Sequence, residues 1–287
     1  MQILVIGASG LLGNNIYKHF TLNNEKVIGT YCHHTLDTKM IKYNINYDDI
    51  EKIDALFSEK IGNKHAIICA GETKIDMCKE KIDMVYETNV SFTISLIKKL
   101  ESLNYHIIFC SSDSIYDGSK GNYIETDIPN PINEYGKMKV AVEKYILKEC
   151  KNTCIIRISK IIGCVHSERD MLIEWRNKAL QKEEINCIKG NYLTPVYIED
   201  VTKCIEVIIN KSLLGIYNIC GNEKYLRIEL CKLFLNKLGL HTKVTERRLE
   251  DFNFNDKRPL DTSMCNKKFV KNTGYKFKDF KEILLNY

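Results

Sequence analysis

A tyrosine and a lysine four residues apart, with a serine upstream, could carry out acid–base chemistry on a carbonyl group. Tyr135 and Lys139 lie in a stretch with helical periodicity, so they share one helix face. A nearby ammonium group favours the phenolate and lowers a tyrosine pKa from about 10 towards neutral pH. Ser112 could hold a substrate carbonyl beside that phenol. Taken alone, this spacing more often marks an ordinary surface helix, so the elements around it must decide.

Those elements predict a strand and a helix that would bring the three residues together. The apolar run 106–110 predicts a buried strand, which the polar residues after it end. A helix over 135–148 follows, with Asn133 as its N-cap and Glu134 in its first turn. Because ligands lie beyond the carboxyl ends of strands in open α/β sheets, Ser112 can meet the helix face that carries the tyrosine and the lysine.

The first residues of the chain predict a dinucleotide site. The apolar strand 2–6 runs into a turn with a glycine at every third position, and a helix follows. Gly7 would permit the tight turn, Gly10 would let the backbone approach a pyrophosphate, and Gly13 would let helix and strand pack closely. The start of the helix offers N–H groups and a partial positive charge to the phosphates. The residues predicted to hold the phosphates are Gly7, Ser9, Gly10, Leu11, Leu12 and Gly13.

The residues after the second strand, 26–31, bear on the choice of cofactor. An acidic side chain there would bind the ribose 2′-OH and reject a 2′-phosphate. The sequence has Tyr31, His33 and His34 at this place, and no acid until Asp37. This pattern favours NADPH, with NADH possible, and puts the histidines near the extra phosphate.

Three further segments are expected to contact the dinucleotide. A short third strand at 44–45 could flank the adenine, through Asn44 and Ile45. A helix over 84–103 carries Asn89, which either supports the backbone near the lysine or lies on the helix surface. The fourth strand, 65–71, ends in small residues that would let the ribose and nicotinamide lie close to the backbone: Cys69, Ala70 and Gly71.

The alternation of strands and helices predicts the fold class. Helices at 50–60 and 84–103 separate strands that end with the sixth, at 154–159, and this order requires a parallel, doubly wound α/β sheet, the Rossmann fold. After Gly163 the pattern loosens, although a helix over 170–182 and extended stretches at 193–197 and 215–220 remain. We expect a dinucleotide-binding domain from 1–163 and 193–221, and a smaller C-terminal substrate-binding lobe from 164–192 and 222–287.

Composition narrows the class further. The 287 residues are 44% hydrophobic and 28% charged, as in ordinary globular proteins, and the net charge of +5 is spread along the chain, so no nucleic-acid surface is predicted. No apolar run reaches the roughly 18 residues that a membrane span needs, and no signal peptide is recognised. The 12 cysteines lie scattered, several of them in apolar runs, without a CxxC pair, which favours buried free thiols in the cytoplasm over a metal site or disulfides.

Together these residues resemble the extended short-chain dehydrogenase/reductases, and more narrowly the dTDP-4-dehydrorhamnose reductase family. The motifs that carry the resemblance are spread over nearly the whole chain. They are Gly7-x-x-Gly10-x-x-Gly13, Ser111-Ser112-Asp113-x-x-Tyr116-Asp117-Gly118, Tyr123-x-Glu125-Thr126-Asp127, Pro131-x-Asn133-x-Tyr135-Gly136-x-x-Lys139, Thr194-Pro195-Val196-Tyr197, Gly215-Ile216-Tyr217 and Arg258-Pro259-Leu260.

The resemblance implies a reaction in deoxysugar and surface polysaccharide biosynthesis, of which dTDP-rhamnose biosynthesis is one example. NAD(P)H would reduce the C4 ketone of a nucleotide-activated 4-keto-6-deoxy sugar. Tyr135 would give the proton, Lys139 would bind the nicotinamide ribose and tune the tyrosine, and Ser112 would bond the carbonyl oxygen. The chain would act as a monomer or homodimer. The substrate contacts implied are Ser112, Asp113, Ser114, Tyr116, Lys160 and Arg258.

Three departures from the family pattern leave the sugar open. Ser114 stands where an aromatic residue is usual, and Lys160 stands where a tryptophan commonly meets the sugar. Lys160 could instead meet an acidic or amino-modified substrate, or point to water. Asn15 replaces a glutamate that in some members shares a magnesium ion between subunits, so no metal is predicted.

Two other functions fit the same resemblance. One is a regulatory subunit like the β subunit of methionine adenosyltransferase, which keeps the fold and binds a dinucleotide while acting through a partner protein. The other is a sugar-nucleotide epimerase or dehydratase of the wider superfamily. Dehydratases usually carry an Asp-Glu pair beside the serine or threonine, and Ser112-Asp113-Ser114 lacks it, which argues against dehydration.

Overall fold

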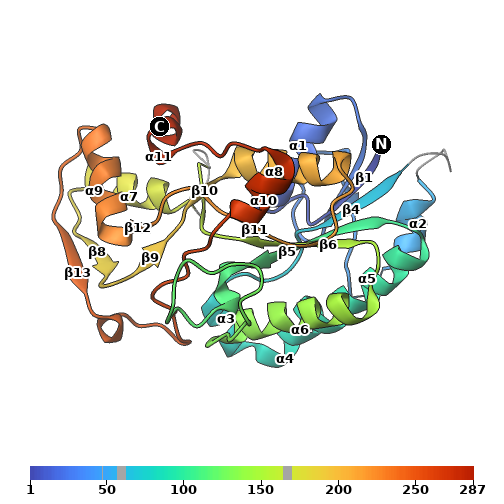
Figure 1. The fold of residues 1–287 in the computed structure, drawn as a ribbon, viewed down its shortest axis with the longest axis horizontal. Coiled ribbons are helices and arrows are strands. Elements are labelled where there is room, and N and C mark those ends of the chain that lie inside the picture. Colours follow the sequence, from blue (N-terminus) through green and yellow to red (C-terminus); the bar gives the residue numbers. More distant parts are fainter. Residues whose placement is uncertain (47, 57–62, 164–169) are drawn as a thin grey trace. The chain divides into compact units, whose positions relative to one another are not determined.

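The computed structural model describes residues 1–46, 48–56, 63–163 and 170–287, and it divides into two compact units (Figure 1). The first unit consists of Met1–Ser111, Glu134–Ile156 and Thr202–Ile216. The second consists of Ser112–Asn133, Arg157–Val201 and Tyr217–Tyr287. The expected division into a cofactor-binding and a substrate-binding part stays a prediction for these units.

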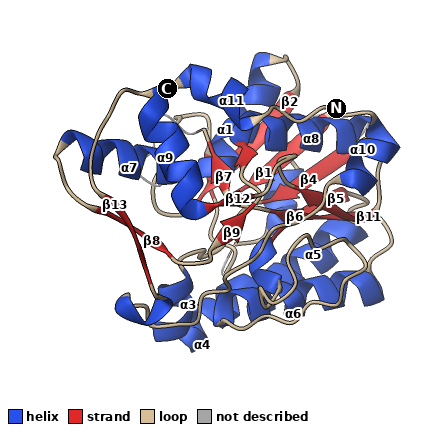
Figure 2. Ribbon diagram, turned by 60° about the vertical axis from the view of Figure 1, so that its left-hand side comes forward, coloured by secondary structure: helices blue, strands red, loops and turns tan. Residues whose placement is uncertain are grey.

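A seven-stranded parallel sheet confirms the predicted doubly wound α/β fold (Figure 2). The sheet order is β11-β6-β5-β4-β1-β2-β3, with the strand order reversing beside β1. Gln2 pairs with Lys26 on one side and with Lys64 on the other. The strands are β1 (Gln2–Ile6), β2 (Lys26–Tyr31), β3 (Ile41–Lys42), β4 (Lys64–Ile68), β5 (His106–Ser112), β6 (Thr153–Ile158) and β11 (Gly215–Ile219).

Helices on both faces of the sheet explain why its central strands are apolar along their whole length. All residues of β1 and β5 are buried, as expected for parallel strands that are covered twice. Helices α5 (Thr93–Ser102) and α6 (Glu134–Glu149) lie on one face, and α1 (Leu11–Leu22) lies on the other (Figure 1). Leu96, Met138 and Val142 of the first two helices pack with Leu4 and Ile107 of the sheet.

The third strand lies earlier than predicted, at β3, and residues 44–45 form a turn instead. The side chain of Asn44 accepts a hydrogen bond from Asn46 N at 3.0 Å, and its backbone N donates to the Asp48 carboxylate at 2.5 Å. These bonds use the donor that a sheet ladder would need. The helix that follows is α2 (Ile50–Asp54), and residues 57–60 of the helix expected there lie outside the described residues.

The predicted helix at 84–103 is interrupted by a π-helical turn. It consists of α4 (Ile82–Tyr86), the π turn Glu87–Phe92 and α5, and α3 (Ile75–Glu80) precedes it. The turn carries Asn89, whose side chain bonds the backbone of Glu72 outside the helix. Such insertions into a helix often occur at functional sites.

The second unit contains short strand pairs and helices. Helix α7 (Met171–Leu180) confirms the helix expected near 170–182, and Asp170 caps it by accepting from Leu172 N at 2.8 Å. Strand pairs are formed by β7 (Ile161–Ile162) with β10 (Val196–Tyr197), β9 (Tyr192–Leu193) with β12 (Tyr225–Leu226), and β8 (Ile185–Ile188) with β13 (Val244–Arg247). The other helices are α8 (Ile198–Asn210), which begins in this unit, α9 (Arg227–Lys237), α10 (Lys267–Thr273) and α11 (Phe280–Ile283).

No helix within the described ranges is both long and apolar enough to cross a lipid bilayer.

Candidate active site

The three glycines of the first turn are glycines for different reasons. Gly7 has a φ of +87°, and a Cβ there would lie 2.8 Å from Ala70 N. A Cβ on Gly13 would overlap the carbonyl oxygen of Gly7. Gly10 has an ordinary φ of −75°, and a Cβ there would meet only the oxygen of Gly7, at 3.3 Å. The fold therefore demands glycine at 7 and 13, whereas at 10 a Cβ would need only a small shift of the Gly7 carbonyl group.

The start of α1 presents an electropositive end beside this turn. Gly10 is the N-cap, its N donates to Gly7 O at 3.0 Å, and no acidic residue stands in the first turn. Ser9, Leu11 and Leu12 are half-buried around it. A helix start of this kind suits an anionic group.

The end of β2 offers no carboxylate to a ribose. Tyr31 is half-buried, and His33 and His34 after it are exposed. The first acid, Asp37, is bonded to its own loop and to α1, since its carboxylate accepts from Lys39 N at 2.9 Å and from the Tyr17 hydroxyl at 3.4 Å.

The backbone after β4 is fixed by Asn89. Cys69 N continues the ladder by donating to Ile6 O at 2.9 Å, and Gly71 then turns with a φ of +138°. The Asn89 amide accepts from Glu72 N at 2.9 Å and donates to Glu72 O at 2.8 Å. Asn89 thus positions the loop that was predicted to lie against the nicotinamide.

Tyr135 and Lys139 lie on one face of α6, as predicted, where Tyr135 is buried and Lys139 is half-buried. The Lys139 Nζ donates to Cys110 O at 2.9 Å and lies 5.7 Å from the centre of the Tyr135 ring. Burial lowers the pKa of Lys139, while the Cys110 and Cys69 thiols and the Glu143 carboxylate oppose this change. A cation held this close to a phenol favours its ionised form.

Glu143 is a site residue that sequence reasoning missed. It lies four residues after Lys139, is 2% exposed, and accepts from the Ser111 hydroxyl at 2.5 Å. The signal was present, because the glutamate falls on the same face of a predicted helix as Tyr135 and Lys139. Its partner on β5 could not be read from the local pattern.

Ser112 ends β5 and belongs to the second unit. Its hydroxyl accepts from Ser114 N at 3.2 Å and donates to Asp113 Oδ1 at 3.1 Å. Thr262 donates to the other oxygen of Asp113 at 2.9 Å. Ser112, Ser114 and Asp113 therefore form one tight turn after the strand.

Asp113 and Lys160 influence each other within the second unit. Burial raises the pKa of Asp113, and the hydroxyls of Thr262 and Ser112 and the Lys160 ammonium oppose this. The protein around Lys160, and then the Arg227 guanidinium, lower the pKa of that lysine, while Asp113 raises it. The lysine side chain remains open to solvent. A positive group is thus available where the family commonly has a tryptophan.

Two of the predicted substrate contacts, Tyr116 and Arg258, interact with aromatic side chains of the second unit. Tyr116 is fully buried, stacks on Tyr123 with ring centres 4.0 Å apart, and has its hydroxyl engaged by Arg157 at 2.9 Å and by Ile124 O at 3.2 Å. These contacts give Tyr116 a packing role, and its contact with the substrate stays a prediction. Arg258 is half-buried, with its guanidinium 4.5 Å from the Phe254 ring centre.

Within the described part of the chain, no three histidine, cysteine or acidic side chains gather as a metal site would need. Asn15, which replaces the metal-binding glutamate of some family members, donates back to Leu11 O at 2.9 Å. The absence of a metal stays a prediction.

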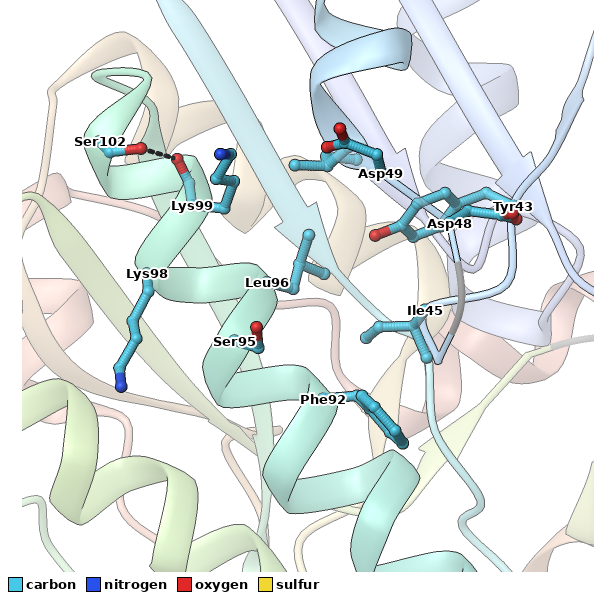
Figure 3. A pocket seen from close by; sticks show the side chains of 11 residues that line it. Tyr43, Ile45, Asp48, Asp49, Phe92, Ser95, Leu96, Lys98, Lys99 and Ser102 are labelled. Carbon is cyan, nitrogen blue, oxygen red and sulfur yellow. Dashed lines mark hydrogen bonds between the residues drawn. The ribbon is translucent and has the colours of Figure 1, made fainter.

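A pocket of about 470 Å³ lies beside α2 and α5 in the first unit (Figure 3). Its apolar part includes Ile45, which was predicted to flank the adenine, and Phe92. Two of its charged groups have partners, since Lys99 bonds Glu51 at 2.5 Å and Asp49 accepts from Glu51 N at 3.0 Å. The full lining is Tyr43, Ile45, Asp48, Asp49, Ile50, Phe92, Ser95, Leu96, Lys98, Lys99 and Ser102.

The sheet, the glycine turn and the Tyr-Lys face of α6 define an extended short-chain dehydrogenase/reductase. Within that class, residues 1–287 match the model of the RmlD substrate binding domain, and the chain belongs to this family. The predicted resemblance to the dTDP-4-dehydrorhamnose reductases is thereby confirmed.

Curated relatives that match the chain include proteins with two different functions. The methionine adenosyltransferase 2 subunit beta of Xenopus tropicalis is 29% identical over 237 residues, covering 80% of this chain and 70% of that protein. The probable low-salt glycan biosynthesis reductase Agl14 of Haloferax volcanii is 26% identical over 227 residues, covering 78% and 75%. Sequence similarity thus reaches both a reductase and a subunit of another enzyme.

Solved structures match over the whole chain. A hypothetical dTDP-4-dehydrorhamnose reductase from Sulfolobus tokodaii has a TM-score of 0.86 and 25% identity, with 100% of this chain and 99% of that chain covered. The dTDP-4-dehydrorhamnose reductase of Bacillus anthracis in complex with NADP has a TM-score of 0.86, 21% identity and coverage of 100% and 99%. The family and the first of these neighbours support a reductase-type enzyme, and the second supports the fold.

Proposed function

We propose that this chain is an NAD(P)H-dependent reductase of the ketone in a nucleotide-activated 4-keto-6-deoxy sugar. One observation carries the proposal. The ammonium of Lys139 is held by Cys110 O at 2.9 Å beside the ring of Tyr135, in the same unit as the glycine turn. A cation fixed beside a phenol, next to a dinucleotide turn, is what carbonyl reduction needs from a protein.

The residues of the first unit fit a dinucleotide. Gly10 leaves open the space that a pyrophosphate would need, at the positive end of α1. The lack of an acid at the end of β2 supports NADPH, with His33 and His34 near its 2′-phosphate. Ile45 and Phe92 offer apolar surfaces to the adenine. When bound, the reduced nicotinamide supplies the hydride.

The chain's own residues would move the proton. Tyr135 gives its hydroxyl proton to the carbonyl oxygen as the alcohol forms, and Lys139 stabilises the phenolate that remains. Ser112 bonds the same carbonyl oxygen. Asp113, Ser114, Lys160 and Arg258 of the second unit would contact the sugar nucleotide.

A turnover assay tests this function. The protein is mixed with dTDP-4-keto-6-deoxyhexose that is made and allowed to epimerise in the same reaction mixture. The oxidation of NADPH and that of NADH are followed in separate reactions. Oxidation of one cofactor is expected. Tyr135→Phe should abolish turnover with NADPH affinity near normal, because it removes only the proton donor. Tyr145→Phe, on the same helix, is the control that should retain the rate. A Tyr135→Phe variant with the wild-type rate would overturn the assignment.

A second candidate is a dinucleotide-binding subunit that acts through a partner. The similarity to methionine adenosyltransferase 2 subunit beta favours it. NADPH binding without oxidation of any keto sugar, together with co-purification of a methionine adenosyltransferase, would support it over the reductase. A cytoplasmic location and a monomer or homodimer stay predictions for either function.

A further inference from the structure

Two thiols touch each other beneath the proposed catalytic lysine. Ile68 of β4 pairs with Phe109 of β5 in a parallel ladder, so Cys69 and Cys110 stand opposite each other at the next position. Their sulfur atoms lie 3.6 Å apart. Both residues belong to the first unit.

The spacing of the strands suits a covalent bond between these sulfurs. Neighbouring strands lie about 4.8 Å apart, which falls within the Cα separations that disulfides span. The sulfurs must approach by about 1.5 Å to reach bonding distance, and side-chain rotation supplies such a movement. Cys69 is half-buried and Cys110 is buried, so a reagent from solvent meets Cys69 first.

We propose that Cys69 and Cys110 form an oxidative modification site that closes to a disulfide by exchange with a low-molecular-weight disulfide. The Cys69 thiolate attacks the small disulfide and expels one thiolate, leaving a mixed disulfide. Cys110 then attacks the Cys69 sulfur and expels the second. Two protein thiols are oxidised, the small disulfide is reduced to two thiols, and the two protons pass to those products.

A disulfide between Cys69 and Cys110 would disturb the proposed cofactor site through the backbone of these two residues. Cys110 O is the acceptor that holds Lys139, and Cys69 begins the loop proposed to lie against the nicotinamide. The disulfide should therefore weaken NADPH binding, and bound NADPH should protect Cys69. This part rests on the proposed function, whereas the chemistry of the thiols does not.

The surroundings make the reaction slow at neutral pH. The hydrogen bond with Cys110 and burial raise the pKa of Cys69 well above its ordinary value, and the Lys139 ammonium opposes this. Lys139 also interacts with Glu143 of its own helix and with Cys78 of α3. Because exchange requires the thiolate, its rate should rise about tenfold for each pH unit below that pKa.

Peptide mapping tests the site. The full chain is treated with oxidised glutathione at several pH values, digested without reduction, and searched for a Cys69–Cys110 linked peptide. Cys69→Ser and Cys110→Ser should each prevent the link. Cys150→Ser is the matched control, because Cys150 is also half-buried with a raised pKa of about 12 but bonds Glu101 instead of a thiol. This control should leave the link intact.

The outcomes separate the site from the function. A linked peptide that dithiothreitol removes supports the site, and only mixed disulfides, or no modification, would overturn it. Because wild-type mapping gives this answer directly, it does not depend on whether a serine variant folds. If the link forms, loss of most NADPH binding and protection by NADPH support the coupling. Unchanged binding of the cross-linked protein would refute the coupling while leaving the site established.

Discussion

Acidification should destabilise the protein through a buried histidine pair at the start of β4 and β5. His65 and His106 are 2% and 5% exposed, and their Nδ1 atoms lie 3.2 Å apart. His106 Nε2 contacts Leu213 O at 3.0 Å, and a carbonyl only accepts, so this nitrogen carries the proton. In a neutral ring the His106 Nδ1 is then an acceptor, and His65 Nδ1 must donate to it. A second proton on either ring would place a charge within the buried pair, and on His106 it would also set two N–H groups face to face.

The sign and size of the effect follow from the pKa of His65. Burial, then His106 and the N-terminus, lower it from 6.5 to about 4, while Glu25 opposes. The unfolded chain therefore binds the proton more readily than the folded one. The stability from this group is complete above pH 6.5 and is lost as the pH falls towards 4. At about 1.4 kcal/mol for each pH unit, the loss attributable to His65 is about 3 kcal/mol.

Urea unfolding at several pH values between neutral and pH 4 measures this loss. His65→Gln should flatten the dependence of unfolding free energy on pH relative to the wild type, because glutamine does not titrate. His241→Gln, at an exposed position, is the control that should keep the wild-type slope. Carboxylates contribute equally to all three proteins, so the difference isolates the contribution of His65. Identical slopes for His65→Gln and the wild type would refute the reasoning.

Three further changes test single features of the first unit. Gly10→Val should weaken NADPH binding, because its side chain would occupy the space proposed for the pyrophosphate; unchanged affinity, by titration, would contradict this. Asn89→Ala should cost about 1–3 kcal/mol in urea unfolding, because it leaves the backbone of Glu72 without two hydrogen bonds. Glu143→Gln should move the alkaline limb of the activity–pH profile to lower pH, since Lys139 loses a neighbouring negative charge. A profile that superimposes on that of the wild type would count against this role of Glu143. Glu149→Gln, at the exposed end of the helix, is the control.

The parts of the fold that could be predicted are those that local sequence decides. β1 follows from five consecutive residues that are buried on both faces, and the turn after it follows from glycines whose neighbours exclude a Cβ. The Tyr-Lys face follows from a spacing of four on one helix. In each case the reason lies within a few residues of the chain, or in the fold class that the alternation of elements implies.

The parts that could not be predicted depend on partners far away in sequence. The π turn at 87–92 carries Asn89, whose hydrogen-bond partner, Glu72, stands seventeen residues earlier. Tyr116 matched a family motif, but its burial depends on Arg157, which comes forty-one residues later. The third strand was misplaced for a local reason, because the Asn44 and Asp48 side chains form a turn that an apolar-run argument does not weigh.

Helix α6 places three chemically different side chains on one face by a regular spacing of four residues. Tyr135, Lys139 and Glu143 follow one another every four residues along one face of the helix. Two consecutive residues of β5 form hydrogen bonds with the lysine and the glutamate. Cys110 O receives the ammonium of Lys139, and Ser111 donates to the carboxylate of Glu143. Burying a lysine is costly unless nearby groups compensate, and the Cys110 carbonyl oxygen and the Glu143 carboxylate one turn along the helix both favour the charged form of Lys139. The arrangement therefore requires both the repeat on α6 and its partners on β5. We expect that altering either of them would change how readily Tyr135 releases its proton, although the tyrosine itself is not replaced.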